Sequence, residues 1–197
     1  MRMIEEVMNI YVGVDPSLNQ PGLAVLDQDG NTLLATSLIV RRGVRGSQRL
    51  STLSHWLSDM LKSCFSTQEV AGVAFEAPSL ESTHREFDLG EASGALKQAL
   101  FYRYPEEPTL VEPTRLKLFA TGNGAAGKED ILHAVKKLYS LDLGSNNDAA
   151  DAWWLARLAW SLDHSTLLKR RCEMEVVHKI LHPKTKQRKI TIPRNDI

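Results

Sequence analysis

The stretch YVGVDPSLNQPGLAVLDQDGNTLLATSLIV, residues 11–40, decides the fold. A short apolar, β-rich run at 10–14 stops just before Pro16, because proline has no N–H to donate to a strand ladder. GLAVLD at 22–27 and TLLATSLIV at 32–40 flank the turn QDGN, whose Asp-Gly pair is a strong hairpin signal. We therefore predict three closely spaced strands, paired antiparallel, before any long helix.

The rest of the chain alternates between helical and extended patterns. Apolar residues recur at helical spacing in four stretches and at strand spacing in two. The predicted helices cover 47–65, 88–102, 128–141 and 147–162, and the predicted strands cover 69–77 and 109–113. The order β-β-β-α-β-α-β-α-α predicts a mixed-sheet α/β or α+β domain.

Composition excludes several classes of protein. With 197 residues, 43% hydrophobic and 24% charged, the chain is expected to be globular rather than disordered. No apolar run approaches the ~18 residues of a membrane span, so we expect no membrane contact. The first ten residues lack the basic start and long apolar core of a secretory signal. Cys64 and Cys172 lie far apart, which argues against a disulfide framework or a zinc site and favours a cytoplasmic location.

Charge is distributed unevenly, although the net charge is zero. Residues 164–197 hold nine Lys/Arg against three Asp/Glu, which gives +6, and residues 1–163 therefore carry −6. We predict a folded domain over 1–163 and a basic C-terminal extension over 164–197, a tail or a hairpin. The alternating patterns of VVHKIL (176–181) and RKITI (188–192), on both sides of a turn, favour a hairpin for part of it. Such an extension suits either contact with a polyanion or a solvated role.

Four carboxylates stand at the ends of core-forming segments. Asp15 follows the first strand, and Glu76 lies near the end of the strand at 69–77. Asp148 and Asp151 are three residues apart, so on a helix they share one face, in a first turn where the helix dipole favours negative charge. Each acid could be a simple cap or turn residue. Together, without a His or Cys cluster, they suit a hard, oxygen-seeking cation such as Mg²⁺ or Mn²⁺.

Five segments of the chain resemble those of the RuvC-like Holliday-junction resolvases of the ribonuclease-H-like fold. They occur in the family's order and at compatible spacing, and they cover most of residues 10–162. The matching segments are YVGVDPSLNQPGLAVLD (11–27), VAFEAP (73–78), LGEASGALKQAL (89–100), TRLKLFATGNGAAGKEDI (114–131) and NNDAADAWWLARLA (146–159). A compact version with a basic tail resembles those carried by bacteriophages and prophages.

This resemblance implies a ribonuclease-H-like mixed five-stranded sheet flanked by helices. It implies that Asp15, Glu76, Asp148 and Asp151 are catalytic acids that bind two Mg²⁺ ions, with Mn²⁺ as an alternative ion. It further implies a homodimer that nicks four-way DNA junctions symmetrically, in the cytoplasm of a bacterium or of a phage-infected cell.

The resemblance also indicates residues for DNA contact. Lys117 and Lys128 lie in segments where the family carries a lysine, and Arg115 lies beside the first of them. The segment after Glu76, APSLESTHREF, departs from the family's junction-probing loop, and His84 and Arg85 within it complete the predicted DNA-contacting set.

Other functions stay open at this point. GNGAAGKE at 122–129 nearly matches a phosphate-binding loop of a nucleotide-hydrolysing protein. Position 129 is however Glu where that loop needs Ser or Thr, and TRLKLFAT before it is more typical of a helix than of a strand, so we expect no nucleotide cofactor. A sugar-kinase or actin-like ATPase is a further alternative. Such a protein normally needs two domains of this kind, and 197 residues allow one. A catalytically inactive module that binds branched DNA is the remaining alternative.

Overall fold

The computed structural model of the protein describes residues 8–77 and 86–183. Within them, five strands form one sheet in the order β3-β2-β1-β4-β5. β1 pairs antiparallel with β2 and β2 with β3, whereas β1, β4 and β5 run parallel. The strands are β1 (Asn9–Asp15), β2 (Gly22–Asp27), β3 (Thr32–Ser37), β4 (Glu69–Glu76) and β5 (Thr109–Val111). The predicted mixed sheet with an antiparallel start is confirmed.

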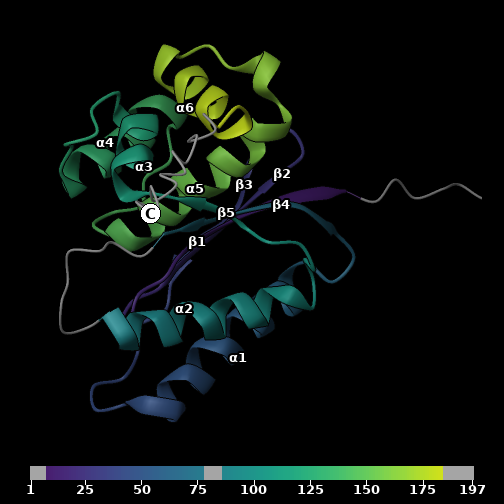
Figure 1. Ribbon diagram of the computed structural model, residues 1–197, viewed down its shortest axis with the longest axis vertical. Coiled ribbons are helices and arrows are strands. Elements are labelled where there is room, and N and C mark those ends of the chain that lie inside the picture. Colours follow the sequence, from purple (N-terminus) through teal and green to yellow (C-terminus); the bar gives the residue numbers. More distant parts are fainter. Residues whose placement is uncertain (1–7, 78–85, 184–197) are drawn as a thin grey trace, which may run out of the picture.

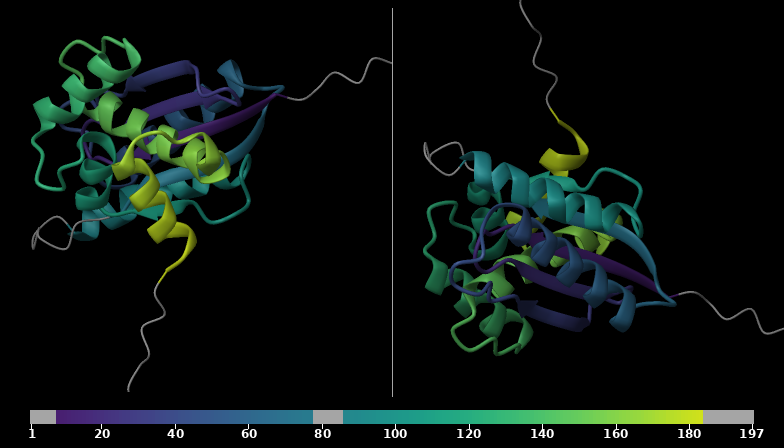
Figure 2. Two further views of the ribbon diagram at one scale, coloured as in Figure 1. Left: turned by 90° about the horizontal axis from the view of Figure 1, so that it is seen from above. Right: turned by 90° about the horizontal axis from the view of Figure 1, so that it is seen from below.

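Helices cover both faces of this sheet. α1 and α2 lie on one face, and α3 to α6 lie on the other (Figure 1), as the views from above and below in Figure 2 also show. The helices are α1 (Gly46–Cys64), α2 (Glu86–Phe101), α3 (Pro113–Thr121), α4 (Lys128–Tyr139), α5 (Asn147–Asp163) and α6 (Arg171–Leu181), with a 3-10 turn η1 (Ser165–Leu167). In the described part of the chain, none of these helices has the length and apolar character needed to cross a membrane.

The alternation of side chains along β1 sorts its residues between the two layers. Ile10, Val12 and Val14 pack in the cluster under α1 and α2, whereas Tyr11 packs in the cluster under α5. Since successive strand residues point to opposite faces, Asp15 belongs to the same face as Tyr11. The first strand therefore delivers its terminal carboxylate to the face that α5 covers.

α5 is buried along most of its length and forms the centre of its layer. Its three tryptophans are core residues with satisfied indole N–H groups. Trp153 donates to the Thr32 hydroxyl at 2.8 Å, and Trp154 donates to the Ile131 carbonyl at 3.2 Å. Trp160 donates to a carbonyl of the β2–β3 turn at 2.9 Å. These contacts hold α5 in one orientation across β2 and β3.

The C-terminal extension differs from the hairpin that its alternation suggested. Residues 171–181 form helix α6, and Val176 and Val177 are buried in the cluster that α5 shares with α3 and α4. The apolar positions 176, 177, 180 and 181 follow helical i, i+1, i+4, i+5 spacing, which fits a helix face better than a strand. Residues 184–197 lie outside the described part, and the domain boundary near residue 163 stays a prediction.

Two predicted strands are shorter than expected because of local signals at their ends. The strand expected over 109–113 ends at Val111, since Pro113 starts α3 with its fixed φ and missing N–H. The strand expected over 32–40 ends at Ser37, and the chain continues into the bend before α1.

Candidate active site

Asp15 and Glu76 stand side by side at one edge of the sheet. Their strands are parallel neighbours, and the last paired residues are Val14 and Phe75, directly before the two acids. Glu76 shares the face of Ala74, which packs in the cluster under α5. Both carboxylates therefore point to the same face, as the predicted site requires.

The environment of Asp15 disfavours its ionised form. Its side chain is buried, with 6% of its surface exposed. Burial raises the pKa of Asp15 well above its ordinary value, and the negative charges of Glu76 and Asp151 raise it further. Because Asp15 and Glu76 repel each other when both are ionised, one of them tends to hold a proton. A cation could take the place of that proton.

The start of α5 approaches the sheet closely because two glycines lie beneath it. A Cβ on Gly13 would lie 2.0 Å from the Ala152 carbonyl oxygen, and a Cβ on Gly22 would lie 2.1 Å from the Asp148 carbonyl oxygen. Gly22 also pairs with Asp15 in the β1–β2 ladder. The missing side chains thus let the first turn of α5 lie directly beside Asp15.

A polar network fixes where α5 begins. Asn146 caps the helix, and its side chain accepts a hydrogen bond from the Ala149 N–H at 3.1 Å. The Asn146 amide also bonds the Ser37 hydroxyl at the end of β3, and Gln20 in the β1–β2 loop donates to the same hydroxyl at 3.2 Å. The loop after Asp15, the end of β3 and the start of α5 are therefore tied together.

The second acid of α5 belongs electrostatically to the same pocket. Burial raises the pKa of Asp151 to about 7, and the charge of Glu76 and then that of Asp148 contribute in the same direction. Asp148 also raises the pKa of Asp15. The charges of the four acids predicted from the sequence thus influence one another where β1, β4 and the start of α5 meet, and we refer to this cluster of four acids as the acidic pocket.

Two of the predicted DNA-contacting lysines face this pocket. The positive charges of Lys117 and Lys128 lower the pKa of both Glu76 and Asp151, against the larger effect of burial. Lys117 lies in α3, and Lys128 is the first residue of α4. They are placed where a negatively charged group entering the pocket would meet them.

The other predicted contacts are distributed differently. Arg115 forms an ion pair with Glu112 at 3.4 Å, one turn away on α3, and is absent from the charges that shift the four acids. His84 and Arg85 lie outside the described residues. The structure thus joins Lys117 and Lys128 to the acidic pocket but not Arg115.

The glycine-rich segment between α3 and α4 is a helix-to-helix connection. Gly122 ends α3 in the left-handed conformation at φ 84°, and the Gly127 N–H donates to the Asp130 carboxylate at 2.9 Å at the start of α4. A nucleotide-binding phosphate loop follows a strand, whereas α3 precedes this one. This geometry agrees with the prediction that the segment is not a phosphate-binding loop. The segment instead places Lys128 at the first position of α4.

The carboxylates are near one another but do not form a closed ligand set. Within residues 8–77 and 86–183, no three His, Cys, Asp or Glu side chains are gathered tightly enough to hold a metal ion as placed. The donors are all carboxylate oxygen atoms in a buried site rich in acids, and this chemistry still fits a hard divalent cation.

Sequence reasoning missed the residues that position the acids. Gly13 and Gly22 carry no chemistry, and Ser37 and Gln20 are ordinary polar residues in a strand end and a loop. The sequence could have revealed these contacts through the two glycines and the small residues of the DAADA helix start, because small residues on both sides permit a helix to pack closely on a sheet.

Comparison with known proteins gives one consistent family. The sequence model of the family described as Crossover junction endodeoxyribonuclease RuvC matches residues 11–158. RuvC of Rickettsia prowazekii is 30% identical over 151 residues, which span 75% of this chain and 94% of that protein. RuvC of Aromatoleum aromaticum is 32% identical over 145 residues, which span 72% of this chain and 75% of that protein.

Solved structures resemble the fold. The structure of Thermus thermophilus RuvC aligns with a TM-score of 0.64 at 21% identity, over 80% of this chain and 97% of the other. The same protein in complex with a Holliday junction substrate aligns with a TM-score of 0.61 at 20% identity, over 75% of this chain and 90% of the other.

Proposed function

Because the chain belongs to the RuvC family of crossover junction endodeoxyribonucleases, we propose that it is a metal-dependent endonuclease that cuts four-way DNA junctions. The observation that supports this most strongly is the meeting of Asp15, Glu76 and the start of α5 in one pocket. Acids whose pKa values are raised by burial and by each other form a site that a divalent cation would stabilise.

We propose Asp15, Glu76, Asp148 and Asp151 as the catalytic and metal-binding residues. The set offers only carboxylate oxygens, the ligands that Mg²⁺ and Mn²⁺ prefer, and we assign two Mg²⁺ ions with Mn²⁺ as an alternative. When bound, such a pair supplies the Lewis acidity that activates a water and stabilises the leaving oxygen of a phosphodiester.

The protein's own residues bring the phosphodiester to this pocket. Lys117 and Lys128 supply positive charge beside the acids and would hold the phosphate group of the substrate. Asp15 and Glu76 stand on rigid strand ends, and the Asn146 cap holds the start of α5. The pocket therefore combines a fixed acidic floor with lysines on α3 and α4.

Symmetric cutting of a junction requires two such pockets. One chain holds one pocket, so we propose a homodimer with a two-fold axis that relates the two sites. A relative of similar fold has been solved with a Holliday junction substrate. We place the activity in the cytoplasm of a bacterium or of an infected host cell, where branched DNA arises.

The deciding experiment compares junction and linear DNA. Labelled synthetic four-way junctions and matched linear duplex are incubated with the protein in Mg²⁺ or in EDTA, and the cuts are mapped. We expect paired cuts in opposite strands of the junction, none in linear duplex, and none in EDTA. Junctions left intact in both Mg²⁺ and Mn²⁺ would favour the inactive binding module instead.

A substitution links the cutting to the pocket. Asp15→Asn should abolish cutting while keeping or strengthening junction binding, because it removes a negative charge that faces DNA phosphates. Asp29→Asn, in the exposed β2–β3 turn, is the matched control and should cut normally. Loss of binding together with cutting in Asp15→Asn would count against the assigned role.

A further inference from the structure

A run of arginines leads into α1 without any acid to balance it. Residues 38–58 contain four arginines and no Asp or Glu. Among the described residues, none of these four side chains forms an ion pair with a carboxylate. The arginines are Arg41, Arg42, Arg45 and Arg49. A body with a net negative charge thus carries one strongly positive segment.

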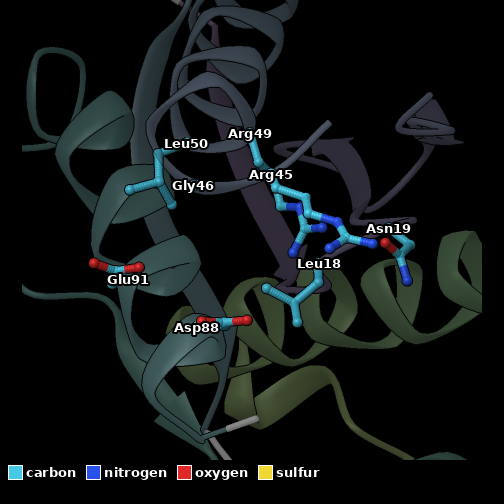
Figure 3. Close-up of a pocket in the computed structure, with 8 residues that line it drawn as sticks. All are labelled: Leu18, Asn19, Arg45, Gly46, Arg49, Leu50, Asp88 and Glu91. Atoms are coloured by element: carbon cyan, nitrogen blue, oxygen red, sulfur yellow. The ribbon is translucent and has the colours of Figure 1, made fainter. Parts of the chain in front are cut away.

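Two of these arginines line a hollow of about 330 Å³ at the start of α1 (Figure 3). Arg45 and Arg49 form one wall, and Leu18 and Asn19 of the β1–β2 loop lie beside them. Asp88 and Glu91 of α2 lie on the opposite side. The hollow therefore has a cationic wall next to the loop that follows Asp15.

The arginine wall is partly preorganised. The Arg49 guanidinium donates two hydrogen bonds to the Val44 carbonyl, at 3.1 and 2.9 Å, which holds it across the first turn of α1. That turn contains no acid and no side chain that caps it, so its N–H groups add to the positive field. Arg45 stands at the cap position and is exposed.

Backbone hydrogen bonds join the segment before α1 to the β1–β2 loop, which follows Asp15. The Val40 N–H donates to the Asn19 carbonyl at 2.8 Å, and the Leu38 N–H donates to the Pro21 carbonyl at 3.0 Å. Asn19 is only four residues beyond Asp15. The arginines are thus held in a fixed relation to the acidic pocket rather than on an independent loop.

We infer that this arginine wall is a second DNA-contacting site, which binds a backbone phosphate of a duplex arm that leaves the acidic pocket. The inference rests on the proposed function and assigns Arg45 and Arg49 to that contact. Guanidinium groups match phosphate geometry and carry no sequence information when bound to the backbone. The site would therefore strengthen binding to branched DNA of any sequence.

The acids opposite the arginines allow a test in which one substitution weakens DNA binding and another strengthens it. A phosphate in the hollow is attracted by Arg45 and repelled by Glu91. Removing positive charge should weaken DNA binding, and removing negative charge from the facing wall should strengthen it. A surface that does not meet DNA would show neither change.

The experiment measures binding of a labelled four-way junction by anisotropy, in EDTA to prevent cutting, at several salt concentrations. The double variant R45Q/R49Q is expected to raise the Kd and to reduce the slope of log affinity against log salt by about 0.9 for each phosphate that is no longer neutralised. Glu91→Gln is expected to lower the Kd. Lys62→Gln, at the far end of α1, is the matched control and should bind as the unmodified chain does.

These outcomes separate the inference from the proposed function. If the double variant keeps the Kd and salt slope of the Lys62→Gln control, or if Glu91→Gln fails to tighten binding, the inference is overturned. Thermal melting and molecular mass confirm that each variant is folded and assembled. Cutting of junctions by the unmodified chain in Mg²⁺ tests the proposed function on its own, whatever the arginine variants do.

Discussion

Gly22 lies against the backbone of Asp148, so closely that a Cβ on the glycine would fall 2.1 Å from the aspartate's carbonyl oxygen. No rotamer change relieves such an overlap, because the opposing atom belongs to the backbone of α5. The glycine therefore sets the distance between the strand pair and the helix start that carries two of the four acids.

Replacing Gly22 by alanine should misplace the acids without removing any of them. We expect Gly22→Ala to shift the first turn of α5 and to lower the cutting rate by about 10²-fold, the size of effect that a ~1 Å misplacement produces. Overpacking should also lower the free energy of unfolding by about 1–3 kcal/mol. Single-turnover cutting and thermal melting measure the two effects.

Gly90→Ala is the matched control for this change. Gly90 lies in α2, and a Cβ there would meet no atom within 4 Å. We expect its cutting rate to remain close to that of the unmodified chain and its free energy of unfolding to rise by up to about 1 kcal/mol, because alanine favours a helix more than glycine does. Normal cutting by Gly22→Ala would show that α5 can move away without cost, against the role given to this contact.

The acidic pocket should make the folded protein less stable as the pH rises, whereas salt-bridged acids make a protein less stable as the pH falls. The pKa of Asp151 is raised to about 7, above its ordinary value of 3.8. The folded chain therefore holds this proton where the unfolded chain has lost it. The resulting stabilisation is fully present below about pH 4 and is lost as the pH rises toward 7.

Divalent cations should reverse this loss, because they bind the ionised carboxylates. We expect Mg²⁺ to raise the melting temperature more at pH 8 than at pH 5, relative to EDTA. Asp151→Asn should flatten the pH dependence measured in EDTA. An equal effect of Mg²⁺ at both pH values would contradict the placement of the ions among these acids.

Lys128 should matter for the reaction more than for stability. It is exposed at the first position of α4, and its charge reaches Glu76 and Asp151. We expect Lys128→Ala to lower the cutting rate by about 10²-fold, as loss of one positioned electrostatic group does, with little change in melting temperature. Lys137→Ala, exposed near the end of the same helix, is the control and should cut normally.

The approach of the four acids to one another could be predicted in part from the sequence, because strand ends and helix spacing carry that information, whereas their catalytic role stays a prediction. Asp15 and Glu76 end apolar runs, and parallel pairing brings such ends together. Asp148 and Asp151 share a helix face by spacing alone. The ribonuclease-H-like sheet and the catalytic role of the acids were implied only by the family resemblance.

What could not be predicted depends on how the elements pack. The contact of Gly22 with Asp148 follows from the position of α5 over the sheet, which no local pattern encodes. Residues 176–181 were expected in a hairpin, because a short apolar run is compatible with both the strand period and the helix period. In the structure they form a helix whose apolar side is buried against α3 and α5. The arginine wall was visible as a charge cluster, but its link to the Asp15 loop was not.

A buried ion pair joins α6 to the body of the protein. Glu173 is 2% exposed and accepts hydrogen bonds from Arg170 and from the Tyr139 hydroxyl, both at 3.1 Å. Arg170 also donates to the Ala120 carbonyl in α3 at 2.7 Å and lies over the Trp154 ring. Arg170→Ala would leave a buried carboxylate without its cation, so we expect a loss of about 3–5 kcal/mol in the free energy of unfolding.

Because Arg170 holds the last turn of α3, the same variant should also loosen the helix that carries Lys117. We expect its cutting rate to fall at a temperature where the chain is still folded, and the double variant R170M/E173L, which removes both charges, to recover much of the stability. Arg171→Ala, exposed at the start of α6, is the control for loss of positive charge. Chemical denaturation and cutting assays on the three variants measure both effects, and an Arg170→Ala chain as stable as Arg171→Ala would show that this ion pair adds nothing to the stability of the protein.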